Sequence, residues 1–133
     1  MVTGRCYCGA VSLAFPPPET VALCHCADCR RWTGAPAPAF ADMPEDALRV
    51  TPPLGPGRRF PSGAVRWVCD VCGSPIAARF SYLPGRLYVP IGLLDQAADL
   101  PPTIACHTDA ILPWCRMGDL PGTAGSARDR LGR

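Results

Sequence analysis

Short runs of apolar and β-branched residues alternate with turn-like segments along almost the whole chain. The runs are AVSLAF (10–15), TVALCHC (20–26), AVRWVC (64–69), PIAARFSY (75–82) and RLYVPIGLL (86–94). The segments between them are rich in proline and glycine, among them FPPPE, TPPLGPG, FPSG, YLPG and LPP. Because short runs bounded by such residues are typical of strands, the sequence predicts a mainly β domain of short, largely antiparallel sheets.

Helices have little room in this pattern, since the chain contains 17 prolines and 13 glycines. ADCRRWTG (27–34) and DQAADLPP (95–102) each predict one helical turn. A length of 133 residues suits a single domain, which we place at residues 1–121. The remaining GTAGSARDRLGR (122–133) is small and polar, and predicts a flexible C-terminal tail.

Charge and composition narrow the functional classes. The formal net charge is +2, which predicts neither a nucleic-acid partner nor a membrane partner. The N-terminus MVTGRCYCGA lacks the apolar stretch of a signal peptide, and no apolar run approaches the ~20 residues of a membrane-spanning helix. We therefore expect a cytoplasmic protein. Thiols stay reduced in that compartment, so nine cysteines favour metal binding over disulfides.

Seven of the nine cysteines fall in three tight groups. Two of the groups end in a glycine, which permits the positive φ that closes a metal-binding turn. In chain order, the groups are Cys6-x-Cys8-Gly9, Cys24-x-Cys26-x-x-Cys29 and Cys69-x-x-Cys72-Gly73. Thiolates are soft ligands that favour zinc over magnesium or calcium.

The number of ligands predicts two zinc ions. A structural zinc takes four protein ligands, whereas a catalytic zinc takes three and keeps one position open. We therefore assign a structural zinc to the two glycine-ended pairs, Cys6, Cys8, Cys69 and Cys72. A second, catalytic zinc with an open position is assigned to Cys24, Cys26 and Cys29. One alternative stays open: a single ribbon-type zinc held by the second and third groups, with Cys6 and Cys8 as ordinary thiols.

The remaining cysteines and both histidines receive structural roles. Cys106 and Cys115 are isolated in the sequence, and such cysteines usually act as small buried hydrophobes. His25 is expected to point away from its neighbouring cysteines if residues 24–26 are extended. His107, at the end of the late strand TIACHTD, is interpreted as a partly buried polar residue.

The order of these motifs is recognisable. GRCYCGAV, CHCADCRRWTGA, GRRFPSGAVRWVCDVCGSPI, VPIGLLD and LPW with DLP together resemble the glutathione-dependent formaldehyde-activating enzyme family, to which centromere protein V is also similar. The resemblance extends from about Gly4 to Pro121. It implies a β-tent-like fold, a structural zinc at the Cys6, Cys8, Cys69 and Cys72 positions, and a catalytic zinc at the Cys24, Cys26 and Cys29 positions.

The sequence therefore predicts a zinc-dependent carbon–sulfur lyase. A thiol, glutathione or a similar one, would lose its proton at the second zinc and add to formaldehyde or a related carbonyl. Arg30 and Arg31 could attract a carboxylate of that thiol. The alternatives are a non-catalytic zinc-binding interaction module, with His25 or Cys106 as a fourth ligand, and a redox or metal-buffering protein. The sequence leaves the oligomeric state open.

Overall fold

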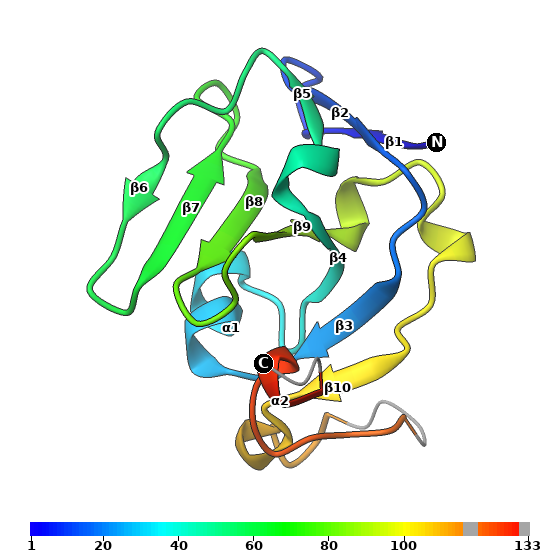
Figure 1. Cartoon of the computed structure of the whole chain (residues 1–133), viewed down its shortest axis with the longest axis vertical. Coiled ribbons are helices and arrows are strands. Elements are labelled where there is room, and N and C mark those ends of the chain that lie inside the picture. Colours follow the sequence, from blue (N-terminus) through cyan, green and yellow to red (C-terminus); the bar gives the residue numbers. More distant parts are fainter. Residues whose placement is uncertain (116–119, 131–133) are drawn as a thin grey trace.

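A computed structural model describes residues 1–115 and 120–130, and its strands form two sheets (Figure 1). The smaller sheet has the order β1-β2-β5, with β1 at Val2–Arg5, β2 at Ser12–Phe15 and β5 at Arg49–Thr51. The larger sheet has seven strands in the order β10-β3-β4-β9-β8-β7-β6. These are β3 (Thr20–Cys24), β4 (Ala39–Pro44), β6 (Arg58–Arg59), β7 (Ala64–Val68), β8 (Pro75–Phe80), β9 (Arg86–Pro90) and β10 (Ile104–Cys106).

Helices are few and short. Within the described residues, the α-helices are α1 (Ala27–Thr33) and α2 (Ala127–Arg130), and the 3₁₀ turns are η1 (Glu45–Ala47), η2 (Ile91–Leu93), η3 (Ala97–Asp99) and η4 (Thr108–Ala110). The predicted mainly β fold is confirmed, as are the helical turns expected within residues 27–34 and 95–102. No helix in the described ranges is long and apolar enough to span a membrane.

One strand pair departs from the antiparallel pattern. β10 runs parallel to β3, with Cys106 opposite Cys24. The other strand pairs of the described chain are antiparallel. This parallel pair brings the chain after residue 106 beside the chain after residue 24. The segments that follow Cys24 and Cys106 therefore leave the sheet at the same end of these two strands.

Two hydrophobic clusters fill the interior. One contains the buried side chains of Phe15, Ile76 and Val89, and includes Cys6 and Cys69. The other is built around Phe40, Phe80 and Tyr88, and includes Cys29 and Cys106. Each cluster includes cysteines among its packed side chains. The packing that stabilises the sheets therefore also fixes the positions of these thiols.

The C-terminal segment packs on the domain where the structure describes it. Gly122 forms a parallel bridge with Ala105 of β10, and Ala127 of α2 is buried in the second cluster. Figure 1 shows this red segment next to β10. The predicted domain boundary at residue 121 stays a prediction, but residues 122–130 contact the domain. Residues 131–133 lie outside the described residues.

Candidate metal centres

Two tight turns build the first cysteine group. Gly9, with φ of 82°, closes the turn after β1 by donating its N–H to the carbonyl of Cys6 at 3.1 Å. Gly73, with φ of 78°, closes the turn between β7 and β8 by donating to the carbonyl of Cys69 at 2.8 Å. A residue with a Cβ is strained at such φ values, which explains the glycine after each pair.

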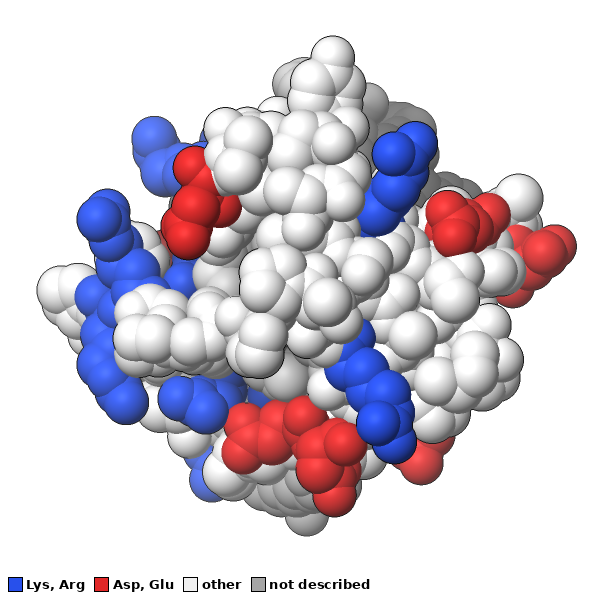
Figure 2. Space-filling model, turned by 90° about the horizontal axis from the view of Figure 1, so that it is seen from above, with Lys and Arg blue, Asp and Glu red and all other residues white. Residues whose placement is uncertain are grey.

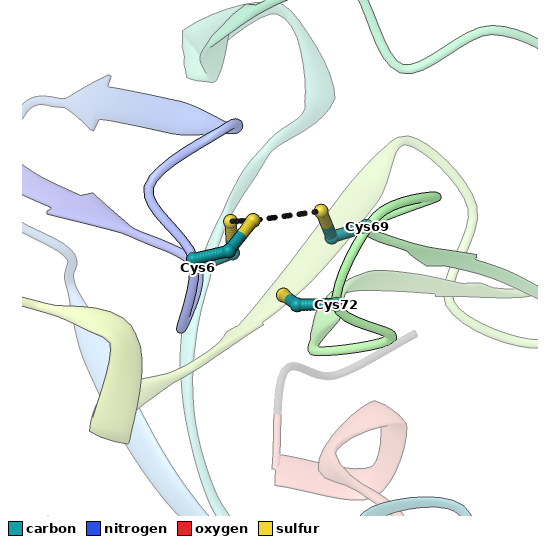
Figure 3. A group of neighbouring side chains, drawn as sticks. Cys6, Cys69 and Cys72 are labelled. Carbon is teal, nitrogen blue, oxygen red and sulfur yellow. Dashed lines mark hydrogen bonds between the residues drawn. The ribbon is translucent and has the colours of Figure 1, made fainter.

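These turns bring the sulfurs of Cys6, Cys8, Cys69 and Cys72 within 4.8 Å of one another. The sulfur of Cys8 lies 3.7 Å from that of Cys6 and 3.8 Å from that of Cys69. Figure 3 shows the sulfur-bearing side chains converging from the two turns. A tetrahedron with metal–sulfur distances of about 2.3 Å has sulfur–sulfur edges of about 3.8 Å. The geometry therefore fits four thiolates around one zinc ion.

The hydrogen bonds around this group favour thiolates. The backbone N–H of Ala10 donates to the sulfur of Cys8 at 3.4 Å, and that of Val11 donates to the sulfur of Cys6 at 3.3 Å. The Ser74 hydroxyl, 3.2 Å from the sulfur of Cys72, lowers the pKa of that thiol to about 5. Deprotonated thiols are the form that binds metal.

The second cysteine group lies where β3 leads into α1. Cys24 ends β3, and Cys26 is the N-cap of α1. The sulfur of Cys26 lies 3.3 Å from that of Cys24 and accepts the backbone N–H of Cys29 at 3.3 Å. A thiolate at a helix N-cap is stabilised by the free N–H groups of the first turn.

The thiols of this group shift one another's pKa values. Hydrogen bonds from Cys24, then from Cys29, lower the pKa of Cys26 to about 2. The hydrogen bond to Cys26 correspondingly raises the pKa of Cys24. Three thiolates this close together would repel one another, so a cation would be needed to hold all three deprotonated.

His107 joins the second group. The ligand atoms of Cys24, Cys26 and His107 all lie within 4.8 Å of one another. Cys29 is not one of these three, although its backbone N–H donates to the sulfur of Cys26. The sequence predicts a partly buried polar residue at His107. Its half-buried position agrees with that expectation, but its closeness to the thiols was missed.

His25 and Cys106, the alternative fourth ligands, are not among the clustered ligand atoms of the second group. Among the described residues, His25 is almost fully buried and neither of its ring nitrogens has a hydrogen-bond partner. Neither His25 nor Cys106 belongs to a group of clustered ligand atoms. The Cys106 side chain lines the pocket described next.

A small apolar pocket opens beside the second group. Its walls are mostly aromatic and aliphatic, and the space open to the centres of water-sized molecules is about 30 Å³. That is enough for one or two waters or a molecule of similar size. The lining includes Cys24, Cys29, Cys106, His107, Phe40, Phe80, Tyr82, Leu83 and Tyr88. The Tyr88 hydroxyl is buried and has no hydrogen-bond partner within the described chain.

A larger groove lies next to α1. It measures about 550 Å³ and is lined by Trp32, Arg58, Arg66, Trp67 and Asp70, among others. Figure 2 shows blue arginine side chains gathered on the side of the molecule where β6 and β7 lie in Figure 1. The groove thus combines aromatic surface with positive charge and one carboxylate.

Arg66 connects this groove to the second cysteine group. Its guanidinium stacks over Trp32, 4.5 Å from the ring centroid, and one nitrogen lies 3.9 Å from the sulfur of Cys29. Arg30 and Arg31 are the arginines next to the cysteines in the sequence. Arg31 is exposed, and the structure instead places Arg66, 37 residues from Cys29 in the chain, against the thiol.

Comparisons with known proteins agree with this arrangement. The family model for the glutathione-dependent formaldehyde-activating enzyme matches residues 1–110. None of the curated proteins matches the chain. The crystal structure of a Rhodobacter sphaeroides protein is similar, with a TM-score of 0.56 and 24% identity over 91% of this chain and 99% of the other. At that identity, the similarity shows a shared fold.

Proposed function

Since the chain belongs to the glutathione-dependent formaldehyde-activating enzyme family, we propose that it condenses a thiol with formaldehyde or a related small carbonyl compound. The reaction belongs to the carbon–sulfur lyase class. Zinc is the proposed metal at both cysteine groups. Cys6, Cys8, Cys69 and Cys72 would hold a structural ion, and Cys24, Cys26 and Cys29 would hold the ion at the reaction site.

The observation that carries this proposal is the pocket beside the second group. Cys24, Cys29, His107 and Tyr88 all line one small, apolar space. Its volume of about 30 Å³ accommodates a molecule the size of formaldehyde and excludes a tripeptide. The carbonyl compound would therefore enter the pocket, while the body of the thiol stays outside it.

The chemistry needs a deprotonated thiol. Zinc, when bound, would lower the pKa of the substrate thiol and so supply the nucleophile. The sulfur then forms a bond to the carbonyl carbon, and the electron pair of the C=O bond moves to the oxygen. The proton released by the thiol returns to this oxygen, giving an S-hydroxymethyl adduct, and the reverse reaction breaks the carbon–sulfur bond.

Tyr88 is placed to assist at the oxygen. Burial raises the pKa of Tyr88, so its hydroxyl stays protonated at neutral pH and serves as a hydrogen-bond donor. A donor aimed at the developing negative charge stabilises the transition state more than the ground state. Since the described structure gives this hydroxyl no other partner, we assign it to the carbonyl oxygen.

The groove beside α1 is the proposed site for the body of the thiol. Arg58 and Arg66 line it, and guanidinium groups bind carboxylates such as those of glutathione in a bidentate manner. Trp32 and Trp67 supply apolar surface for the peptide portion. Arg66 reaches from the groove to Cys29, so a thiol anchored there would have its sulfur directed towards the second cysteine group.

The test is the rate at which glutathione and formaldehyde exchange with their adduct, measured by NMR exchange spectroscopy against the uncatalysed rate. The wild-type protein is expected to accelerate this exchange, and Cys26→Ser to remove the acceleration while the protein stays folded. Tyr88→Phe should reduce it by about 10- to 1000-fold, the range for one transition-state donor. A zinc-loaded wild type that accelerates neither glutathione nor other small thiols would overturn the proposal.

A second function is favoured by one observation. His107 lies among the ligand atoms of the second group, and a fourth protein ligand is typical of a structural zinc. In that case the domain would be a non-catalytic zinc module. Exchange measurements distinguish the two functions, because a module would leave the rate at its uncatalysed value.

A further inference from the structure

The backbone of His107 adopts an unusual conformation. With φ of 56° and ψ of 45°, it is in the left-handed region, and no other non-glycine residue of the described chain has a positive φ. Histidine is tolerated there better than most residues, but the conformation still costs energy. Such conformations persist when the surroundings enforce them, and they are concentrated at functional sites.

Contacts on both sides hold His107 in this conformation. Its N–H donates to the carbonyl of Gly125 at 3.1 Å, and its carbonyl accepts the N–H of Ala110 at 3.0 Å. The preceding residue, Cys106, lies opposite Cys24 in the β3–β10 pair and accepts the N–H of His25 at 3.0 Å. The β3–β10 strand pair thus places His107 next to the thiols, and the hydrogen bond to Gly125 in the C-terminal segment holds its backbone there.

We propose that His107 is the fourth protein ligand of the second zinc, which is then a three-cysteine, one-histidine centre. The inference rests on the proposed zinc at Cys24, Cys26 and Cys29, and specifies its resting state. Cys24, Cys26 and His107 offer ligand atoms within 4.8 Å of one another, and together with Cys29 they would make up the four ligands of a tetrahedral site. Imidazole nitrogen is a common zinc ligand.

The resting centre is therefore closed, and a substrate thiol has to compete with the imidazole for its place. Thiolate is the softer ligand and is favoured over imidazole once it is deprotonated. His107 also lines the small pocket, so its displacement would leave the imidazole next to the carbonyl compound. The closed resting state protects the ion from water and other small ligands until a suitable thiol arrives.

The test is the ligand set of the metal in the substrate-free protein. X-ray absorption at the zinc edge, with both sites loaded, should show seven sulfurs for each imidazole, identified by multiple scattering from the ring. The chain has only two histidines, and His25→Leu serves as the control that keeps this signal. His107→Asn tolerates the left-handed backbone but should abolish the signal and weaken binding of the second zinc about tenfold or more.

His107→Cys is a second variant with a distinct signature. On cobalt substitution it should increase the sulfur-to-metal charge-transfer absorption, because the number of thiolates per protein rises from seven to eight. Wild-type protein whose metal shows no imidazole scattering would overturn the inference, even if a variant failed to fold. The outcome is separate from turnover: an imidazole ligand without catalysis refutes the proposed function alone, and catalysis without an imidazole ligand refutes this inference alone.

Discussion

Arg66 on β7 donates to the carboxylate of Asp28 on α1 at 2.7 Å, and the same nitrogen lies 3.9 Å from the sulfur of Cys29. The side chain of Arg66 is 4% exposed, whereas that of Asp28 is 57% exposed. The ion pair therefore covers a buried guanidinium and links α1, which contains Cys29 and is capped by Cys26, to the large sheet. The relationship connects a cysteine motif to a strand nearly 40 residues further along the chain.

Replacing Arg66 should weaken the second metal site and spare the first. Arg66→Met removes the ion pair and the positive charge next to Cys29, so binding of the second zinc is expected to weaken about 10- to 100-fold. Competition with a chromophoric chelator measures both sites in one titration. Arg79→Met is the matched control, since Arg79 forms an ion pair with Glu45 at 3.2 Å on the exposed side. Equal losses in the two variants would contradict the assignment.

Loss of the first metal site should unfold the domain. Cys72→Ser removes one of four clustered thiols. Structural zinc contributes an apparent ~10–16 kcal/mol, comparable with the whole stability of ~5–15 kcal/mol of a domain. We expect one zinc fewer and a loss of cooperative thermal unfolding by circular dichroism. Cys115→Ala, a buried cysteine outside both groups, should keep both ions and the transition. A cooperatively folded Cys72→Ser protein would refute the structural role.

The pair formed by Asp42 and Arg86 should be costly to break from one side. Arg86 donates from Nε to Asp42 at 2.8 Å, and the two side chains are 9% and 1% exposed. Arg86→Met leaves the carboxylate buried and uncompensated, with an expected loss of about 3–5 kcal/mol in urea unfolding. The double variant Asp42→Leu/Arg86→Met should recover most of this loss, because no unpaired charge remains. Additive losses in the double variant would exclude this explanation.

His25 should make the fold sensitive to mild acid. Burial lowers its pKa below the ordinary value of 6.5, so below about pH 6.5 the unfolded chain binds a proton that the folded chain refuses. Stability contributed at neutral pH is therefore lost as the pH falls from 6.5 towards the lower folded-state value. His25→Leu removes this term while keeping the metal ligands. The urea midpoint of the wild type should fall relative to that of the variant as the pH drops below 6.5, and parallel curves would contradict the prediction.

Strands with strong local patterns could be predicted from the sequence, and the others could not. The segment 64–69 has alternation and β-branched residues, and it forms β7. β1 escaped prediction because VTGR contains a glycine and only one β-branched apolar residue. Gly4 is needed there, since a Cβ would lie 2.5 Å from the carbonyl oxygen of Leu93. That requirement comes from packing between distant segments, which local patterns do not encode.

The residues of the candidate site also fall into those that local spacing predicts and those that depend on the tertiary structure. Spacing within the chain predicts that Cys24, Cys26 and Cys29 act together, and the structure clusters Cys24 and Cys26; the shared role of all three stays a prediction. His107 and Arg66 depend on strand pairing and sheet order, so their sequence positions give no distance to the thiols. The one local signal was the Cys-His pair at the end of a short apolar run. The nearness of this pair to the second cysteine group can be inferred only once β10 is known to run parallel to β3.

The four-cysteine group has a consequence for the newly made protein. Its two halves are 61 residues apart in the chain, measured from Cys8 to Cys69. At the ~5–20 residues per second of ribosomal synthesis, the first pair waits roughly 3–12 seconds for the second. During that interval the nascent chain carries unpaired thiols that are open to oxidation. Under the proposed zinc binding, the four-thiolate site forms only after the second pair has been made, so a shortage of zinc would lower the yield of folded protein.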